Sequence, residues 1–239
     1  MFKFTAIIAC ITVLALTPAL AQTAVLPPGE KAPPAPSGQT KRNAVLSDAA
    51  SITEDLIGFA LDGQTAKVAA KVSSLRQALV TLRPLLDDQT YEVLERRTTA
   101  MEKAVAGKDA LGAALVAVEA YRIIENAMDA AGRTAPVEVA MLDYAGFKLS
   151  VLAAGKRPNW ARITATAKES GEFWSALGKT VSDKSMHNLI AAIQEGLNSA
   201  VARKDINSVK FAAKVLLEAV DVLEQYFRGT YKTPGGNPR

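Results

Sequence analysis

The sequence predicts an all-α protein of about eight helices, arranged as two related modules. Three observations support this class. Apolar side chains recur at alternating steps of three and four residues, which places them on one face of a helix. No comparable stretch alternates strictly between apolar and polar side chains, as a half-buried strand would. Finally, motifs of the first half of the chain return in the second half in the same order.

The first 21 residues have the form of a secretory signal peptide. Lys3 gives a charged start, an apolar run covers residues 7–16, and residues 19–21 form an A-x-A cleavage site. A retained membrane anchor would need about 20 apolar residues, and a lipoprotein would use Cys10, beyond which the apolar stretch continues. We therefore expect cleavage after Ala21, no stable membrane span afterwards, and a periplasmic or secreted protein.

The composition excludes several classes of function. Cys10 is the only cysteine and lies in the predicted leader, so the mature chain would have no disulfide, cysteine nucleophile or thiolate metal site. Its stability must come from a hydrophobic core, for which roughly 218 residues are enough. The whole chain has 28 Lys and Arg against 24 Asp and Glu. This mild balance, without a long basic run, argues against a nucleic-acid partner.

Residues 22–42 are predicted to form a proline-rich linker. Proline favours extended conformations and prevents helix formation, so the segment should act as a semi-rigid tether. A proline-rich ligand for a recognition domain is the alternative reading of the same composition.

Residues 43–133 are predicted to form the first helical module. Turn signals at 61–65, 83–88 and 106–109 divide it into four helices, and Asp109 is a suitable N-cap for the last. Two apolar faces are clearest: Val68, Val72, Leu75, Leu79 and Leu82 in one helix, and Tyr91, Leu94, Thr98, Met101 and Val105 in the next.

Residues 134–228 are predicted to form the second module, and 229–239 a flexible tail rich in Gly and Pro. Turns at 154–159, 178–183 and 202–205 separate its helices, with Ser182 and Asp205 as N-caps. Pro136 and Pro158 suit the first turn of a helix. The apolar faces are Trp160, Ile163, Ala167, Ser170, Trp174 and Leu177; Met186, Ile190, Ile193, Leu197 and Ala200; and Val209, Ala213, Leu216, Val220, Leu223 and Phe227.

Three matched stretches indicate that the modules are copies of one another. They are DLIGFAL at 55–61 with DYAGFKL at 143–149, AVAGKD at 104–109 with AVARKD at 200–205, and VEAYRIIE at 118–125 with LEAVDVLE at 217–224. Their common order predicts an internal duplication. Each copy can close as an antiparallel four-helix bundle, or the helical hairpins can stack as a short α-solenoid. The narrow apolar faces favour bundles.

The first match supplies the candidate ligand-binding residues: Asp55, Gly58, Phe59, Asp143, Gly146 and Phe147. A glycine inside a helix costs about 1 kcal/mol relative to alanine, so something should offset this cost in both copies. Close helix packing beside the phenylalanines is one explanation, and a ligand against exposed backbone is the other. In the ligand hypothesis both aspartates face a shared cavity, whereas solvated acids near a helix start are the simpler account.

Paired acids raise the question of a metal site. Glu119 and Glu125, repeated as Glu218 and Glu224, suggest the carboxylates of a di-iron bundle. Such sites also need Glu-x-x-His on two helices. Because the chain has one histidine, that site is excluded.

His187, the single histidine, carries the alternative function. Covalent haem is excluded because the chain has no C-x-x-C-H motif. A non-covalent haem or metal carrier would use His187 with a second ligand from Met101, Met128 or Met141.

Recognisable catalytic motifs are absent from the sequence, including G-x-S-x-G, H-E-x-x-H and a glycine-rich phosphate loop. We therefore expect a non-catalytic protein without a cofactor that binds a partner protein or small ligand between the two copies. An accessory, chaperone or stress-response role would fit. A weaker alternative is a hydrolase or transferase with Asp55 and Asp143 as acid and base. The oligomeric state is left open.

Overall fold

The computed structural model describes residues 38–229, and within this range the chain forms eight α-helices, two 3-10 turns and no strand. The elements are α1 Gly38–Leu61, α2 Thr65–Leu82, η1 Arg83–Leu85, α3 Asp88–Ala106, α4 Ala110–Asn126, η2 Ala130–Gly132, α5 Val137–Ala154, α6 Trp160–Leu177, α7 Lys184–Ala202 and α8 Ile206–Phe227. The all-α prediction is confirmed.

The ends of the predicted organisation fall partly outside this range. The predicted signal peptide, the linker as far as residue 37 and residues 230–239 of the predicted tail lie outside the described residues. Helix α1 begins at Gly38, so residues 38–42 of the predicted linker are helical. Across residues 38–229, every helix is too short or too polar to cross a membrane.

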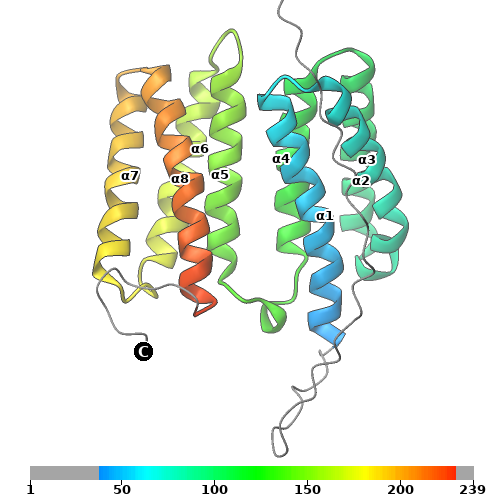
Figure 1. Cartoon of the computed structure of the whole chain (residues 1–239), viewed down its shortest axis with the longest axis horizontal. Helices are drawn as coiled ribbons and strands as arrows, with labels where there is room; N and C mark the ends of the chain where they lie inside the picture. Colours follow the sequence, from blue (N-terminus) through cyan, green and yellow to red (C-terminus); the bar gives the residue numbers. More distant parts are fainter. Residues whose placement is uncertain (1–37, 230–239) are drawn as a thin grey trace, which may run out of the picture. The chain divides into compact units, whose positions relative to one another are not determined.

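Helices α1 to α4 form the first module. Helix α1 packs against α2 and α4, and α3 packs against the same two helices, so the four close into a ring. Successive helices run in opposite directions (Figure 1). Each helix contributes fully buried side chains to one core, such as Leu46, Leu75, Leu94 and Ile124. This is the packing of an antiparallel four-helix bundle.

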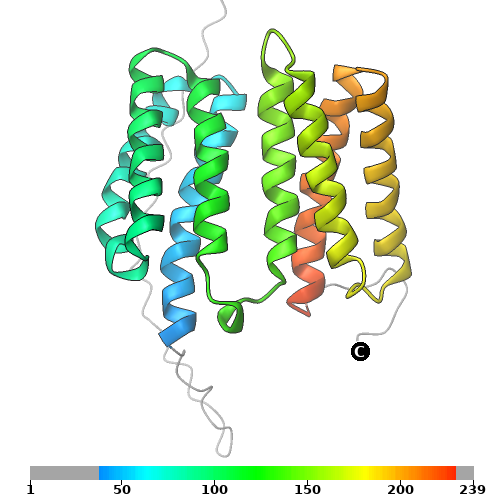
Figure 2. The ribbon, with the colours of Figure 1, turned by 180° about the vertical axis from the view of Figure 1, so that it is seen from behind.

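Helices α5 to α8 form the second module with the same order of contacts. Helix α5 packs against α6 and α8, and α7 packs against the same two helices; Figure 2 shows α5 and α6 from the other side. One part of the core contains Leu142, Trp174, Ile190 and Leu223. The contacts of α1 with α4 and of α5 with α8 close each ring, which favours bundles over an open solenoid.

The two modules meet mainly through α5, which contacts both α4 and α1. Tyr144 and Val151 of α5 belong to the core cluster of the first module. We call the region where α1 and α4 face α5 and α8 the seam.

One turn has the same geometry in both modules. Lys108 has φ 58° and Lys204 has φ 52°, both in the left-handed region that non-glycine residues rarely adopt. The next residue, Asp109 or Asp205, donates its amide to the carbonyl five residues earlier at 2.9 Å in both turns. Each aspartate then caps the following helix. This correspondence supports the duplication, which remains a prediction.

Several helix starts differ by one or two residues from the prediction. The N-cap of α7 is Asp183, whose carboxylate accepts the amide of Met186, and not Ser182. Pro136 stands at the N-cap of α5. Pro158 precedes Asn159, which caps α6. The sequence marks these loops correctly, but several neighbouring residues in each are able to cap.

Candidate functional site

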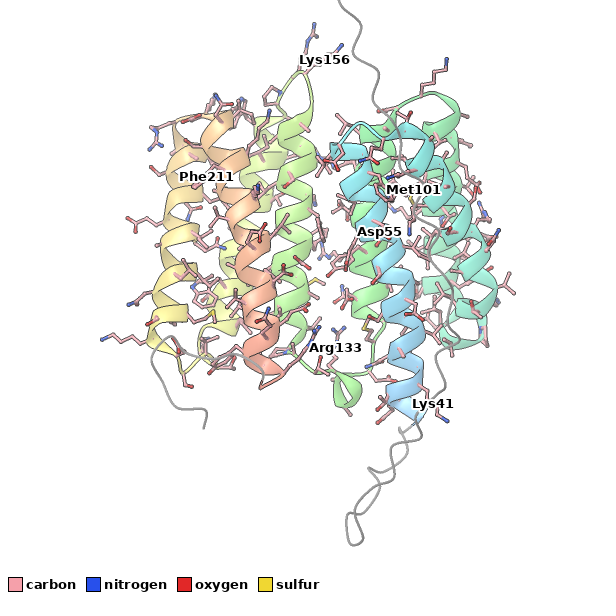
Figure 3. All side chains as sticks on the ribbon, viewed as in Figure 1. Lys41, Asp55, Met101, Arg133, Lys156 and Phe211 are labelled. Carbon is pink, nitrogen blue, oxygen red and sulfur yellow. The ribbon has the colours of Figure 1, made fainter. Side chains whose placement is uncertain are left out.

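The structure does not bring Asp55 and Asp143 into one cavity. Asp55 is exposed on α1 (labelled in Figure 3), and its Oδ2 lies 2.5 Å from Nζ of Lys71 on α2. Asp143 lies on α5, where its Oδ2 accepts a hydrogen bond from the hydroxyl of Tyr121 on α4 at 3.3 Å. Asp55 therefore serves a contact inside the first module, whereas Asp143 lies at the seam.

The two repeated glycines have different surroundings. A Cβ at Gly146 would lie 2.7 Å from Cδ2 and 2.9 Å from Cγ of Leu217, so this glycine allows α8 to pack closely on α5. Gly58 is exposed, and a Cβ there would meet nothing within 4 Å. The packing explanation fits Gly146 and does not fit Gly58.

The two phenylalanines also differ. Phe147 makes an edge-to-face contact with Tyr121, with ring centroids 5.7 Å apart, and so joins α5 to α4. Phe59 packs against the core of the first module. Nζ of Lys67 lies 4.8 Å from the centroid of its ring. Of the six candidate residues, Asp143, Gly146 and Phe147 thus mediate contacts of α5 with its neighbours.

A cavity of about 390 Å³ lies along the seam. Its walls come from α1, α4, the connection between α4 and α5, α5 and α8. The side chains that decide its chemistry are Glu54, Tyr121, Glu125, Arg133, Glu224 and Arg228, beside apolar Pro136 and Val139. Arg133 lies near the C-terminal end of α8 (Figure 3). The cavity therefore combines carboxylates of both modules with two arginines.

Glu54 is the least compensated of these groups. Among the described residues its carboxylate has no hydrogen bond or ion pair, although it is only partly exposed. Burial, followed by the negative charges of Glu125 and Glu224, raises the pKa of Glu54 to about 7. Near neutral pH this side chain is therefore divided between its charged and neutral forms.

Asp143 and Tyr121 form a second perturbed pair. Burial, with the negative charges of Glu54 and Glu224, raises the pKa of Asp143 well above its ordinary value, and the hydrogen bond from Tyr121 opposes this shift. Burial and the charge of Asp143 raise the pKa of Tyr121 in turn. A phenol that remains protonated can act as a hydrogen-bond donor here.

The other two carboxylates of the cavity have arginine partners. Oε2 of Glu125 lies 3.1 Å from Nη1 of Arg133, with both side chains only about a tenth exposed. Arg133 also donates to the backbone carbonyl of Glu125. Burial still raises the pKa of Glu125, although Arg133 acts in the opposite direction. Oε2 of Glu224 pairs with Arg228 at 2.6 Å.

A different polar network lies on the α6 side of the contact between α4 and α5. Nζ of Lys148 lies 3.0 Å from Glu119 and 3.8 Å from Glu169, and Arg122 lies 3.8 Å from Glu169. Both cations also lie over the ring of Tyr144, at 5.1 Å for Arg122 and 4.8 Å for Lys148. Two acids and two bases balance here, so this network holds the modules together without excess charge.

The alternative site at His187 receives no support from its contacts. His187 is exposed, and its ring lies 5.2 Å from that of Trp174. Met101, one of its suggested partners, is fully buried in the core of the first module. Within residues 38–229, no three His, Cys, Asp or Glu side chains are placed to hold a metal ion.

Sequence reasoning missed Glu54, Tyr121 and Arg133 as cavity residues. The match of 118–125 with 217–224 did contain Glu125 and Glu224, but only as rejected iron ligands. Comparison of the chain with family models, curated proteins and solved structures finds no match. The functional argument therefore rests on the geometry of the seam.

Proposed function

We propose that this protein is an exported, non-catalytic binding protein whose small ligand or partner segment enters the seam cavity. The observation that carries the proposal is the unpaired Glu54 carboxylate in the wall of a cavity of about 390 Å³. Cavities of a few hundred Å³ are large enough for small-molecule ligands. A partly buried carboxylate without a cation gains most from a ligand that supplies one.

The cavity favours a ligand with a positively charged end and an apolar body. A cationic group beside Glu54 would also be attracted by Asp143 and Glu224, whose charges couple to Glu54. Pro136 and Val139 offer apolar contact in the same cavity. An amine or guanidinium on a short carbon chain has this combination, whether it belongs to a small molecule or to a Lys or Arg side chain of a partner protein.

Two observations support a non-catalytic role. The proposed acid and base, Asp55 and Asp143, contact different helices and do not face one another. In the cavity, Glu125 and Glu224 are held by Arg133 and Arg228. Export is proposed from the leader-like first residues of the sequence.

The test uses agmatine, which carries an amine and a guanidinium, and glutarate as an anionic control. We expect agmatine to shift backbone amide resonances of residues around Glu54, Glu125 and Glu224 in a saturable NMR titration, and glutarate to leave them unchanged. Glu54→Gln should weaken agmatine binding at least tenfold, while Asp55→Asn, one residue away and outside the cavity, should not. Equal binding by parent and Glu54→Gln, or the absence of saturable shifts, would reject the proposal.

A further inference from the structure

We propose that the seam is a proton-controlled joint: carboxylates of the two modules oppose one another across it, and their deprotonation loosens the contact on the α1 and α8 side. The inference concerns the ligand-free protein. Its test does not depend on whether the cavity binds agmatine.

The joint is built from acids on both sides of the seam. The first module contributes Glu54 and Glu125, which line the seam cavity, and the second contributes Glu224 of the same cavity and Asp143, which is hydrogen-bonded to the cavity residue Tyr121. The coupling crosses the seam: Glu54 experiences the charges of Glu224 and Asp221, and Asp143 that of Glu54. Like charges brought together in a partly buried region repel more strongly than in water.

The compensating groups on this side are fewer. Arg133 pairs with Glu125, and Arg228 pairs with Glu224. The hydroxyl of Tyr121 donates to Asp143, but it carries no positive charge. Asp55, whose charge also reaches Glu54, points to Lys71 on α2. Among the described residues, the four seam carboxylates thus have two arginine partners, and full deprotonation leaves excess negative charge.

The α6 side of the same contact is arranged differently. There Lys148 and Arg122 balance Glu119 and Glu169 around Tyr144. The connection between α4 and α5 is anchored to α1 as well, because Asn43 exchanges two hydrogen bonds of 2.9 Å with the backbone of Asp129. Repulsion between the acids would therefore open the seam on the side of α1 and α8, while the α6 side acts as the hinge.

The direction in which pH changes the seam follows from the carboxyl groups whose pKa is raised by packing. Packing raises the pKa of Glu54 to about 7 and that of Asp143 well above its ordinary value, so the closed seam holds more protons than an open, hydrated one. Acid therefore favours the closed seam, and a rise in pH favours the open one. For Glu54 alone, a return of its pKa to the ordinary value of 4.5 on opening raises the open-to-closed ratio by up to roughly 140-fold between pH 4.5 and pH 8.

The experiment measures the distance between the outer helices of the two modules. Gln77→Cys on α2 and Asn198→Cys on α7 replace exposed residues that have no side-chain hydrogen bond or ion pair among the described residues. They are introduced into the full chain with Cys10→Ser, spin-labelled and studied by pulsed electron resonance at pH 5 and pH 8. We expect a longer and broader distance distribution at pH 8.

A matched pair of variants separates this inference from general flexibility. Glu54→Gln with Asp143→Asn should keep the short distances of pH 5 at pH 8, whereas Asp55→Asn, which removes only one of the smaller charge effects on Glu54, should keep most of the response of the parent. Should the double variant lose its helical circular dichroism, Glu54→Gln alone is measured and should lose most of the response. The proposal is overturned by a parent distribution that does not change with pH, or by an undiminished response in the Glu54→Gln protein.

Discussion

Replacing Glu54 by glutamine tests the electrostatics of the seam most directly. The side chains are nearly equal in size, so the substitution removes a charge and changes little else. The rise in pKa from 4.5 to about 7 corresponds to about 3 kcal/mol of unfavourable interaction for the charged form. This is an upper estimate, because Glu54 is partly exposed and solvent screens some of its interactions.

The effect has a defined dependence on pH. Below about pH 4.5 the carboxyl is protonated in both native and unfolded chains, and glutamine should have little effect. Between about pH 4.5 and pH 7 the unfolded chain loses this proton more readily than the native one, so the parent becomes less stable as the pH rises. At pH 8 Glu54→Gln should therefore be more stable than the parent by up to about 3 kcal/mol.

Urea unfolding followed by far-UV circular dichroism at pH 4.5, 6, 7 and 8 gives the required free energies, provided that the slope with urea is the same in both proteins. Asp55→Asn is the control. Its exposed carboxylate pairs with Lys71, and the loss of such a pair costs at most about 1 kcal/mol. A stability difference between Glu54→Gln and the parent that is constant across this pH range, or that favours the parent at pH 8, would refute the reasoning.

Two further predictions concern packing and pairing. Gly58→Ala should raise the free energy of unfolding by up to about 1 kcal/mol, because a Cβ meets nothing there. Gly146→Ala should lower the free energy of unfolding by about 1–3 kcal/mol, because the Cβ collides with Leu217. Thermal unfolding of both variants measures the two changes, and changes of the same sign would contradict the contacts. Arg133→Met should lower the free energy of unfolding by about 3–5 kcal/mol at neutral pH, because it leaves Glu125 buried and unpaired. This loss of stability should be smaller in acid, where Glu125 is protonated. Urea titrations at pH 4.5 and pH 7.5 measure the loss at each pH, and a loss that does not change with pH would contradict the pairing.

The sequence predicts the helices well because their signals are local. Leu94, Thr98 and Met101 repeat at helical spacing and are all fully buried in α3. The turn at residues 106–109 is marked by Gly and an aspartate cap, and the structure places it between α3 and α4. Spacing and capping involve residues within a few positions of one another, so no knowledge of distant contacts is needed.

The site was less predictable because it depends on which helices face one another. Adjacent residues in a helix point about 100° apart, so Glu54 faces the seam while Asp55 faces α2. The repeat pointed to Asp55 because this aspartate aligns with Asp143 of the second copy, whereas the side chain whose charge couples to Asp143 is Glu54. Gly58 and Gly146 also show that the repeat does not predict tertiary contacts: the two glycines align in sequence, but Gly58 is exposed and Gly146 is packed against Leu217.

The proposed binding site and the proposed proton-controlled joint both depend on the uncompensated charge of Glu54. Together they predict how ligand binding changes with pH. A proton and a cationic ligand both neutralise Glu54, so they should compete. Agmatine should then bind more weakly by up to tenfold per unit as the pH falls below about 7, and should release a proton on binding near that pH. Calorimetric titrations at pH 6.5 in buffers of different ionisation enthalpy measure this proton release. Binding that saturates in the seam without proton release would mean that the ligand does not neutralise Glu54, whereas proton release that disappears in Glu54→Gln would assign the exchange to that carboxyl group.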